Sequence, residues 1–537
     1  MKKRSVTPLR LGSEILLVTL CLTYMLSMLL LYSGIGINSW IFPSSLVLSI
    51  VIGWFSKGNL TEKTFILTAI SVMAFVVVSI LLAIPVSDYS YDGNMYHQEI
   101  VALLTSGWNP VETSVPSDKI SLWARHYAKA LEVIESAVVS CVGLIESGKA
   151  VNLMLVASAA GFVYDFLHHR FPELSARSCC LITAVALANP VCMAQLPTFY
   201  IDFGKYIYTM LAIVLLIEWG SFVEPRRNLM LLCVVICLAA GTKFNAFFEM
   251  GVVVFAACLW MAMKRDWRRV WVLASVAALA AIISVVVAWH PYITNLIDRG
   301  HPLYPLMGAG AVDIMTGNTP PVFEGHSRVV NFMISVAYPG VPTYDNRIGG
   351  FGPFMLLMLI ISAYWIIRYR SVAGALPIYI CVWIVVSCFF FDESWWARYI
   401  SQLWLLLPIA ALTAFRAGRR CRLLLALAFL TGLTGLGLST FKGLYASCYR
   451  SAVCDASTEG YVIMSKSGPG ISRHFEEKGL KIVEISGGVE TADCDTLSFW
   501  GLTSSASPYI YVDKGAAGRI AAGIPAWMQR VSAATSR

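Results

Sequence analysis

The chain has 537 residues, of which 57% are hydrophobic and only 13% charged, and its mean hydropathy is +0.68. The charged fraction is about half that of an ordinary soluble domain, which excludes a soluble globular protein. The net charge of +8 does not indicate nucleic-acid binding, because the basic residues lie in short clusters between apolar runs. We therefore expect an all-α polytopic membrane protein.

The N-terminal residues Met1–Arg4 are basic and are followed by an apolar run at about 12–33. This run lacks a clear small-residue cleavage site, and more apolar runs follow it. We therefore expect a retained first helix rather than a signal peptide.

Membrane spans are counted from the thickness of the hydrocarbon core, about 30 Å, which requires about 20 apolar residues per helix. About thirteen candidate spans result, near residues 12–33, 40–56, 64–86, 148–167, 178–194, 200–219, 229–241, 245–263, 270–290, 351–367, 373–391, 400–415 and 421–440. The pair 229–241 and 245–263 is the weakest, and one kinked unit is the alternative interpretation.

The basic residues predict the orientation, because Lys and Arg near span ends favour the cytoplasmic side. With a cytoplasmic N-terminus, the basic groups all fall inside: Lys2–Arg4, Lys57 and Lys63, His168–Arg170, Arg226 and Arg227, Lys264–Arg269, Arg368 and Arg370, and Arg416–Arg422. Three long regions, about 87–147, 291–350 and 441–537, then lie outside. We expect a multi-pass protein of a bacterial inner membrane whose function faces the periplasm.

The tail has the composition of a small folded domain. The sequence therefore predicts a transmembrane domain at 1–440 and a small periplasmic α/β domain at 441–537. Strand-like segments lie at 461–464, 481–485 and 509–512, and a helix-like segment lies at 471–478. Because this region would lie in an oxidising compartment, we expect a disulfide between Cys448 and Cys454.

The first outer loop is the most informative stretch. Asp88 and Asp92 follow the third span, and the apolar spacing of 96–105 predicts a helix along the membrane interface. A carboxylate at the water–lipid boundary suits chemistry on an amphiphilic substrate. A solvated loop whose aspartates cap helices is the alternative interpretation.

Four short motifs share the outer side: Tyr91–Glu99, Gly107–Pro110, Gly300–Pro305 and Trp396–Tyr399. Together with the span pattern, they resemble polytopic glycosyltransferases of the GT-C type over most of residues 64–415. The chain differs from that family in having two more spans before the acidic loop and in having His301 where Asn is usual.

This resemblance implies that a sugar passes from a polyprenyl-phosphate carrier to a glycan, lipid or protein acceptor on the outer face, with inversion. It implies Asp92 as general base with Asp88 as a second candidate. It also implies contacts to the donor or acceptor from His97, Glu99, Asp202, Lys243, His301, Tyr304, Arg347 and Arg398. A divalent metal held by His97 and Glu99 together with Asp92 or Asp88 stays open, although residues two apart on a helix do not share a face.

Other functions remain as alternatives. A transporter or flippase for a lipid-linked saccharide would show internal repeats and buried charges in several spans, and no repeat is visible. A polysaccharide polymerase or ligase would rely on arginines such as Arg328, Arg347 and Arg398. A structural membrane subunit is a further alternative, in which Arg398 would snorkel to lipid phosphate or pair with Asp392 or Glu393.

Overall fold

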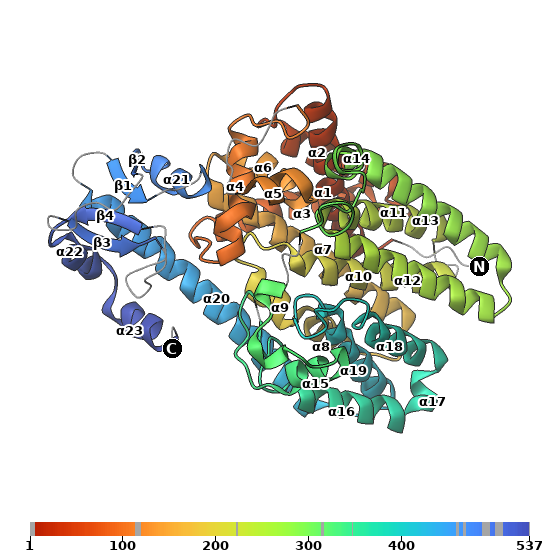
Figure 1. The fold of residues 1–537 in the computed structure, drawn as a ribbon. Helices are drawn as coiled ribbons and strands as arrows, with labels where there is room; N and C mark the ends of the chain where they lie inside the picture. The colour runs from red at the N-terminus through yellow and green to blue at the C-terminus, as the bar shows by residue number, and fades with distance from the viewer. Residues whose placement is uncertain are drawn as a thin grey trace.

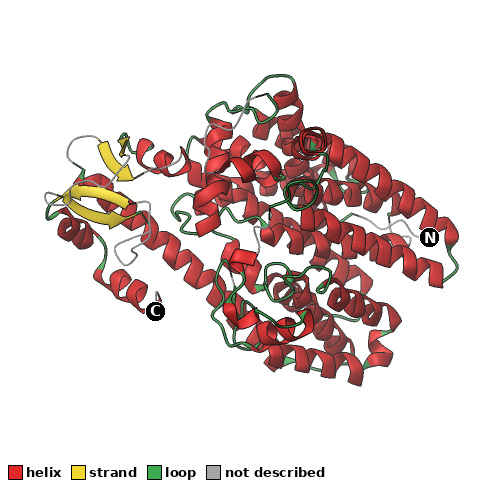
Figure 2. Cartoon of the chain, in the orientation of Figure 1, coloured by secondary structure: helices red, strands yellow, loops and turns green. Residues whose placement is uncertain are grey.

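The computed structural model describes residues 6–112, 120–221, 224–312, 316–345, 347–457, 461–465, 469–485, 494–499 and 509–535. These residues form a large helical body and a small C-terminal domain of helices and strands (Figure 1). Among the described residues, strands occur only in the C-terminal domain, where Figure 2 draws them in yellow.

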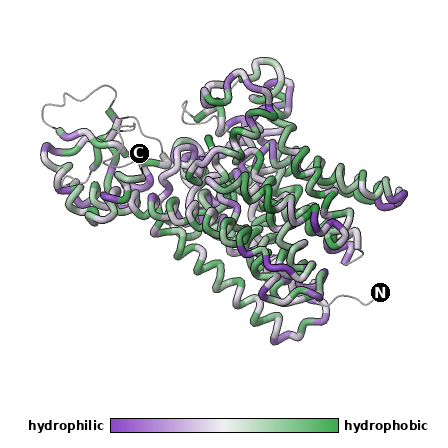
Figure 3. Tube along the Cα trace, turned by 90° about the horizontal axis from the view of Figure 1, so that it is seen from below, coloured by the Kyte–Doolittle hydropathy of each residue, from purple (hydrophilic) through white to green (hydrophobic). Residues whose placement is uncertain are grey.

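The helical body confirms a membrane protein. Eight helices among the described residues are long and apolar enough to span a bilayer: α1 (Pro8–Tyr32), α3 (Glu62–Ala83), α7 (Ala150–Arg170) with the turn before it, α10 (Asp202–Gly220), α11 (Pro225–Thr242), α12 (Phe244–Met263), α13 (Trp267–Val287) and α20 (Arg422–Ala456). Figure 3 shows the apolar character of these long helices, with hydrophilic residues gathered mainly at turns and ends.

Shorter apolar helices coincide with the five remaining expected spans: α2 (Ile41–Ser56), α8 (Ala176–Leu187), α16 (Met355–Arg368), α18 (Ala375–Ser387) and α19 (Leu406–Arg416), the last preceded by a short 3-10 turn at Ser401–Leu405. Length and composition establish eight membrane-spanning candidates, so the number of about thirteen stays a prediction. The same is true of the cytoplasmic N-terminus and the inner membrane.

The segment around Lys243 separates two helices. Helix α11 ends at Thr242, Lys243 is extended with φ −160° and ψ 141°, and α12 begins at Phe244. Both helices pack against α10 and against each other. The alternative of one kinked unit at 229–263 is therefore wrong.

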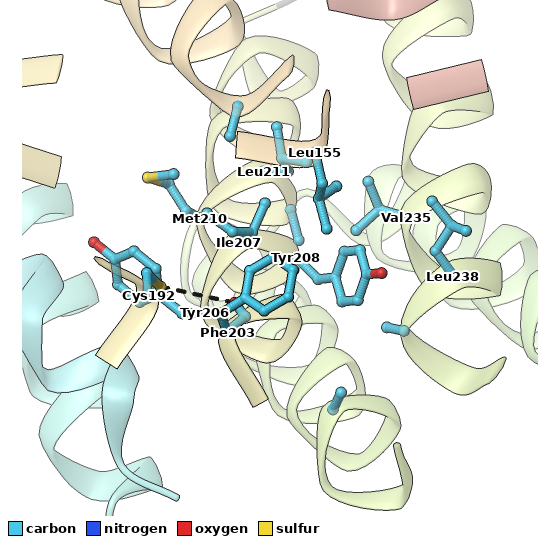
Figure 4. Packing of buried hydrophobic residues seen from close by; sticks show 14 of the residues in the cluster. Leu155, Cys192, Phe203, Tyr206, Ile207, Tyr208, Met210, Leu211, Val235 and Leu238 are labelled. Carbon is cyan, nitrogen blue, oxygen red and sulfur yellow. Dashed lines mark hydrogen bonds between the residues drawn. The ribbon is translucent and has the colours of Figure 1, made fainter. Parts of the chain in front are cut away.

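Helix α10 lies in the core and is buried along most of its length. Figure 4 shows Phe203, Tyr206 and Tyr208 among aliphatic side chains of neighbouring helices. The Tyr206 hydroxyl donates to the Ala186 carbonyl at 2.6 Å, so this buried polar group has a partner. Such packing fixes the N-terminal end of α10, where Asp202 is its first residue.

The first outer region folds into the body instead of lying on the membrane surface. A π-helical turn at Gly93–His97 leads into α4 (Gln98–Thr105), and residues 98–104 are all buried. Helix α4 packs against α6 (Ala130–Val142) and α21 (Pro469–Glu476). The prediction of an interfacial helix at 96–105 is wrong, because protein rather than lipid covers its apolar side chains.

The C-terminal domain contains a four-stranded sheet in the order β2-β1-β4-β3. Strands β1 (Tyr461–Ser465) and β2 (Lys481–Ile485) are parallel, whereas β4 (Tyr509–Asp513) is antiparallel to β1 and to β3 (Cys494–Ser498). The three predicted strands are confirmed, and β3 is additional. Helices α21, α22 (Ala516–Gly523) and α23 (Ala526–Thr535) accompany the sheet.

Helix α20 joins the two parts of the chain and passes through the predicted boundary at 440 without interruption. Its last turns carry Tyr449 and Val453, which pack with Met464, Phe475 and Ile510 of the C-terminal domain. The core of this domain therefore includes the end of a membrane helix.

The predicted disulfide between Cys448 and Cys454 is not formed, and both thiols are free. Both residues lie on α20, six positions apart. Six residues of helix advance about 9 Å along the axis, which exceeds the Cα separation of up to about 7 Å that a disulfide bridges. Helix geometry therefore excludes this pairing.

The C-terminal domain is docked on the first outer region through buried hydrogen bonds. The Gly470 amide donates to Glu99 Oε2 at 2.6 Å, and the Ile145 amide donates to Glu477 Oε1 at 2.6 Å. Arg450, near the end of α20, donates to the Asp88 carbonyl at 2.8 Å. The segment that carries Asp92 is thus held from the C-terminal side.

Glu477 should make this docking depend on pH. Burial raises the pKa of Glu477 from 4.5 to about 6, although the Ile145 amide acts in the opposite direction. Between these values the folded chain binds more protons than the unfolded chain, so stability falls as pH rises from about 4.5 to 6. Glu477→Gln keeps an acceptor for Ile145 and should abolish this dependence in thermal unfolding scans; an unchanged dependence would contradict the assignment.

Candidate functional site

Arg398 is the centre of the candidate site. It lies in a turn between α18 and Ser401, and the Tyr399 amide closes this turn on the Trp396 carbonyl at 2.8 Å. Lys205 Nζ, from α10, donates to the Tyr399 carbonyl at 2.5 Å. The guanidinium lies over the Trp396 ring, 3.9 Å from its centroid. The aromatic residues around Arg398 therefore fix its position as well as covering it.

Three carboxylates from distant segments surround the Arg398 guanidinium. Nη1 lies 2.9 Å from Asp92 Oδ2 and 3.3 Å from Asp202 Oδ2, and Nε lies 3.7 Å from Asp345 Oδ1. Such a convergence of the first outer region, the start of α10 and the second outer region indicates a built site.

Two further cations complete the arrangement. Lys243 Nζ pairs with Asp202 Oδ1, and Arg347 Nε lies 2.7 Å from Asp345 Oδ2. We call Asp92, Asp202, Lys243, Asp345, Arg347 and Arg398 the Arg398 cluster. Its three carboxylates and three cations balance in charge.

The side chains of the Arg398 cluster differ in how far they are exposed. The side chains of Asp202 and Arg398 are 2% and 9% exposed, whereas those of Asp92 and Lys243 are 19% and 15% exposed. Burial by itself lowers the pKa of Arg398, but Asp202 and Asp92 outweigh it and raise that pKa above its usual value. The guanidinium therefore stays charged at the bottom of the site.

Asp345 is the member of the cluster that the sequence did not reveal. It lies in an irregular segment of the second outer region, and the Trp396 indole donates to its carbonyl at 2.7 Å. The available signal was the pair of opposite charges at Asp345 and Arg347. By contrast, the structure brings together the predicted residues Asp92, Asp202, Lys243, Arg347 and Arg398.

Asp88 lies apart from the cluster and is fully buried. Its Oδ1 accepts from the Ser90 amide at 2.6 Å, and its Oδ2 accepts from the Phe199 amide at 2.7 Å. Both oxygens are thus engaged by backbone donors, and the predicted role as a second base does not fit this position. Asp88 instead ties the loop of Asp92 to the segment before α10.

His97 and Glu99 point to different partners. His97 Nδ1 lies 2.7 Å from Glu132 Oε1 in a buried pair, whereas Glu99 accepts from Gly470 of the C-terminal domain. Neither belongs to the Arg398 cluster. Among the described residues, no group of three His, Cys, Asp or Glu side chains could hold a metal ion.

His301 and Tyr304 belong to a second location. The Leu303 amide donates to His301 Nδ1 at 3.1 Å, and the Tyr304 ring packs edge-on against His126 with centroids 4.6 Å apart. Asn295 Nδ2 donates to the Tyr304 carbonyl at 2.8 Å. The structure therefore gives Tyr304 a contact with α14 (Trp289–Arg299) and His301 a contact within its own loop, rather than contacts with Arg398.

An apolar groove of about 330 Å³ runs between α10, α12 and α18. One end is lined by Lys264, Asp266 and Arg269, and Glu249 and Ser387 also line it. Glu249 Oε2 lies 3.7 Å from Lys205 Nζ, and the same Nζ bonds Tyr399. A single side chain, Lys205, therefore links the groove to the turn of Arg398.

Comparison with known proteins does not assign a family. No protein-family model matches the sequence, and no curated protein matches it. A function is therefore inferred from the residues and the geometry of the chain.

Gly93 should be essential for the shape of the Asp92 loop. A Cβ at this position would lie 2.1 Å from Asp88 Oδ2 and 2.2 Å from Ser90 Oγ. We expect Gly93→Ala to lower the free energy of unfolding by about 1–3 kcal/mol, as overpacking does. Gly251→Ala is the matched control, because its Cβ meets nothing within 4 Å. Equal thermal stability of both variants would contradict this account.

Proposed function

We propose that this protein is a membrane glycosyltransferase. It transfers a sugar from a polyprenyl-phosphate carrier to an acceptor on the outer face of the membrane, with inversion at the anomeric carbon. The observation that carries the proposal is the Arg398 cluster, in which the partly exposed Asp92 pairs with Arg398 while Arg398 and Lys243 share the buried Asp202, where the outer regions meet α10 and α12.

The cations suit the phosphate of the donor. Arg398 offers a planar fork of donors and Lys243 a compact charge, both suited to phosphate oxygens. As the glycosidic C–O bond breaks, negative charge develops on the leaving phosphate, and these two cations stabilise it. The groove between α10, α12 and α18 has the apolar lining that a prenyl chain needs.

Asp92 suits the role of general base. Its Oδ2 bonds Arg398, so Oδ1 is the oxygen that meets the acceptor hydroxyl. The hydroxyl oxygen attacks the anomeric carbon from the face opposite the phosphate, its proton passes to Asp92, and polyprenyl phosphate leaves. This single displacement inverts the anomeric centre.

Donor binding would also release the base from its ion pair. Arg398 is paired with Asp92 at 2.9 Å, so a donor phosphate would compete with Asp92 for the guanidinium. A phosphate oxygen that takes the place of Asp92 on Arg398 leaves the carboxylate for the acceptor hydroxyl. Asp202 keeps both cations in place throughout, because it bonds Lys243 and Arg398 from the buried side.

The role of Asp92 as general base is tested with Asp92→Asn in purified protein in lipid nanodiscs. The protein receives a panel of polyprenyl-phosphate sugars, and release of polyprenyl phosphate is the readout. We expect turnover to fall about 10²- to 10⁴-fold, since a general base contributes about that much. Binding of polyprenyl phosphate should be at least as tight as in the wild type, because a competitor for Arg398 has been removed.

Two results would overturn this assignment. Unchanged turnover in Asp92→Asn would exclude Asp92 as the base. If the wild type releases no polyprenyl phosphate and no donor raises its thermal stability, the protein does not use this donor class, and a transporter or a structural subunit would explain the cluster better.

A further prediction concerns the contribution of the Arg398 guanidinium to donor binding. We expect Arg398→Ala to weaken binding of polyprenyl phosphate about 10- to 100-fold, the value of a charge-assisted hydrogen bond. Arg398→Lys should fall between wild type and Ala, because a point charge replaces only part of the fork. Equal affinity in all three proteins, measured by the same nanodisc assay, would reduce Arg398 to a structural residue.

A further inference from the structure

We propose that a second polar cavity on the outer side, formed by Trp108, Glu112, Arg125, His126, His290, Thr294, Asn295 and Asp298, binds one neutral sugar unit of the acceptor. Its volume is about 190 Å³. Its role as an acceptor subsite rests on the proposed transferase function, whereas its affinity for a neutral sugar does not.

The cavity lies where three parts of the outer sequence meet. Trp108 and Pro110 come from the segment that follows α4, Arg125 and His126 from α5 (Ser121–His126), and His290 and Asn295 from α14. A volume of about 190 Å³ is that of about six water molecules. This space suits a single monosaccharide ring rather than a longer glycan or a lipid.

A residue with a buried, unpartnered donor lines the cavity. Trp108 is 6% exposed, and within the part of the chain that the structure describes, its indole Nε1 has no hydrogen-bond partner. A buried donor without a partner costs about 1–3 kcal/mol. A ligand hydroxyl in the cavity would remove this cost, and the indole face offers a surface for the apolar side of a sugar ring.

The two histidines present complementary groups. His126 Nδ1 lies 2.7 Å from Asn295 Oδ1, and the amide nitrogen of Asn295 donates to the His126 carbonyl at 3.1 Å. Nδ1 of His126 therefore donates, and its Nε2 is an acceptor. His290 Nδ1 lies 2.9 Å from Lys129 Nζ and accepts from it, so its Nε2 is a donor. Alternating donors and acceptors match the hydroxyl groups of a sugar.

The charges of the cavity favour a neutral ligand. Arg125 is paired with Asp298 at 3.2 Å, and Glu112 adds a carboxylate at the exposed edge. Burial lowers the pKa of His126, so its ring is neutral at pH 7. Among the residues that the structure describes, the lining therefore holds no unpaired cation that would select a phosphate or a carboxylate.

The cavity adjoins the Arg398 cluster through Tyr127, the residue after His126. The Tyr127 ring packs against Phe244, which follows Lys243, with centroids 5.7 Å apart. Tyr96, from the motif that contains Asp92, stacks on Trp123 of α5 at 5.4 Å. These contacts link α5 and Tyr127 to the residues beside Lys243 and Asp92, so an acceptor that occupies the cavity with one sugar would extend toward Asp92 with another.

The test uses the full-length protein in lipid nanodiscs without any donor. Saturation-transfer NMR measures binding of the methyl glycosides of glucose, galactose, mannose and N-acetylglucosamine, with inorganic phosphate as the charged probe. At least one glycoside should bind saturably, and Trp108→Phe should weaken it about 3- to 10-fold, the value of one hydrogen bond. Trp271→Phe is the matched control, because Trp271 is 70% exposed on α13 and should not alter binding.

Thr294→Val removes a second polar group from the cavity and should weaken the same glycoside, which keeps the test valid if Trp108→Phe is unstable. The inference is overturned if no glycoside binds the wild type, if phosphate binds instead, or if both cavity variants bind as the wild type does. Glycoside binding by a protein that does not bind or turn over polyprenyl-phosphate sugars would support the cavity and reject the transferase.

Discussion

The pairing of a buried guanidinium with three carboxylates is the interaction on which the other features of this molecule depend. A buried cation is costly unless it is paired and hydrogen-bonded, and here the partners come from segments more than a hundred residues apart. The first outer region, α10 and the second outer region must therefore all be in place before Arg398 is satisfied. Assembly of the site therefore requires the folded membrane body.

The position of Asp92 depends in turn on contacts that have no part in the proposed chemistry. Asp88 binds backbone amides on both sides, and Arg450 binds the carbonyl of Asp88 from the end of α20. Deep within the body, the tyrosines of α10 hold Asp202 at its helix start. Rigid support of this kind keeps a charged site in one geometry while lipid and water exchange around it.

Hydropathy predicted most of the architecture, because each span must satisfy its backbone within one continuous apolar segment. It also placed five of the six residues of the Arg398 cluster on one side of the expected spans. It failed where tertiary contacts decide: residues 98–104 look interfacial until α6 and α21 cover them, and Asp345 lies in a segment without periodicity. The roles of Asp88 and Glu99 were inaccessible, since spacing does not reveal which backbone amide a carboxylate meets.

Helix α20 has a mechanical consequence. Its 35 residues measure about 52 Å at 1.5 Å per residue, whereas the hydrocarbon core is about 30 Å thick. Roughly 20 Å of this helix therefore extends beyond the apolar layer, and its end packs inside the C-terminal domain. Within the part of the chain that the structure describes, no flexible linker separates α20 from the core of the C-terminal domain. The domain therefore changes its position only when α20 tilts. Because packing against neighbouring helices sets the tilt of a membrane helix, the contacts of α20 with α9 (Pro190–Gln195) and α16 set the height of that domain.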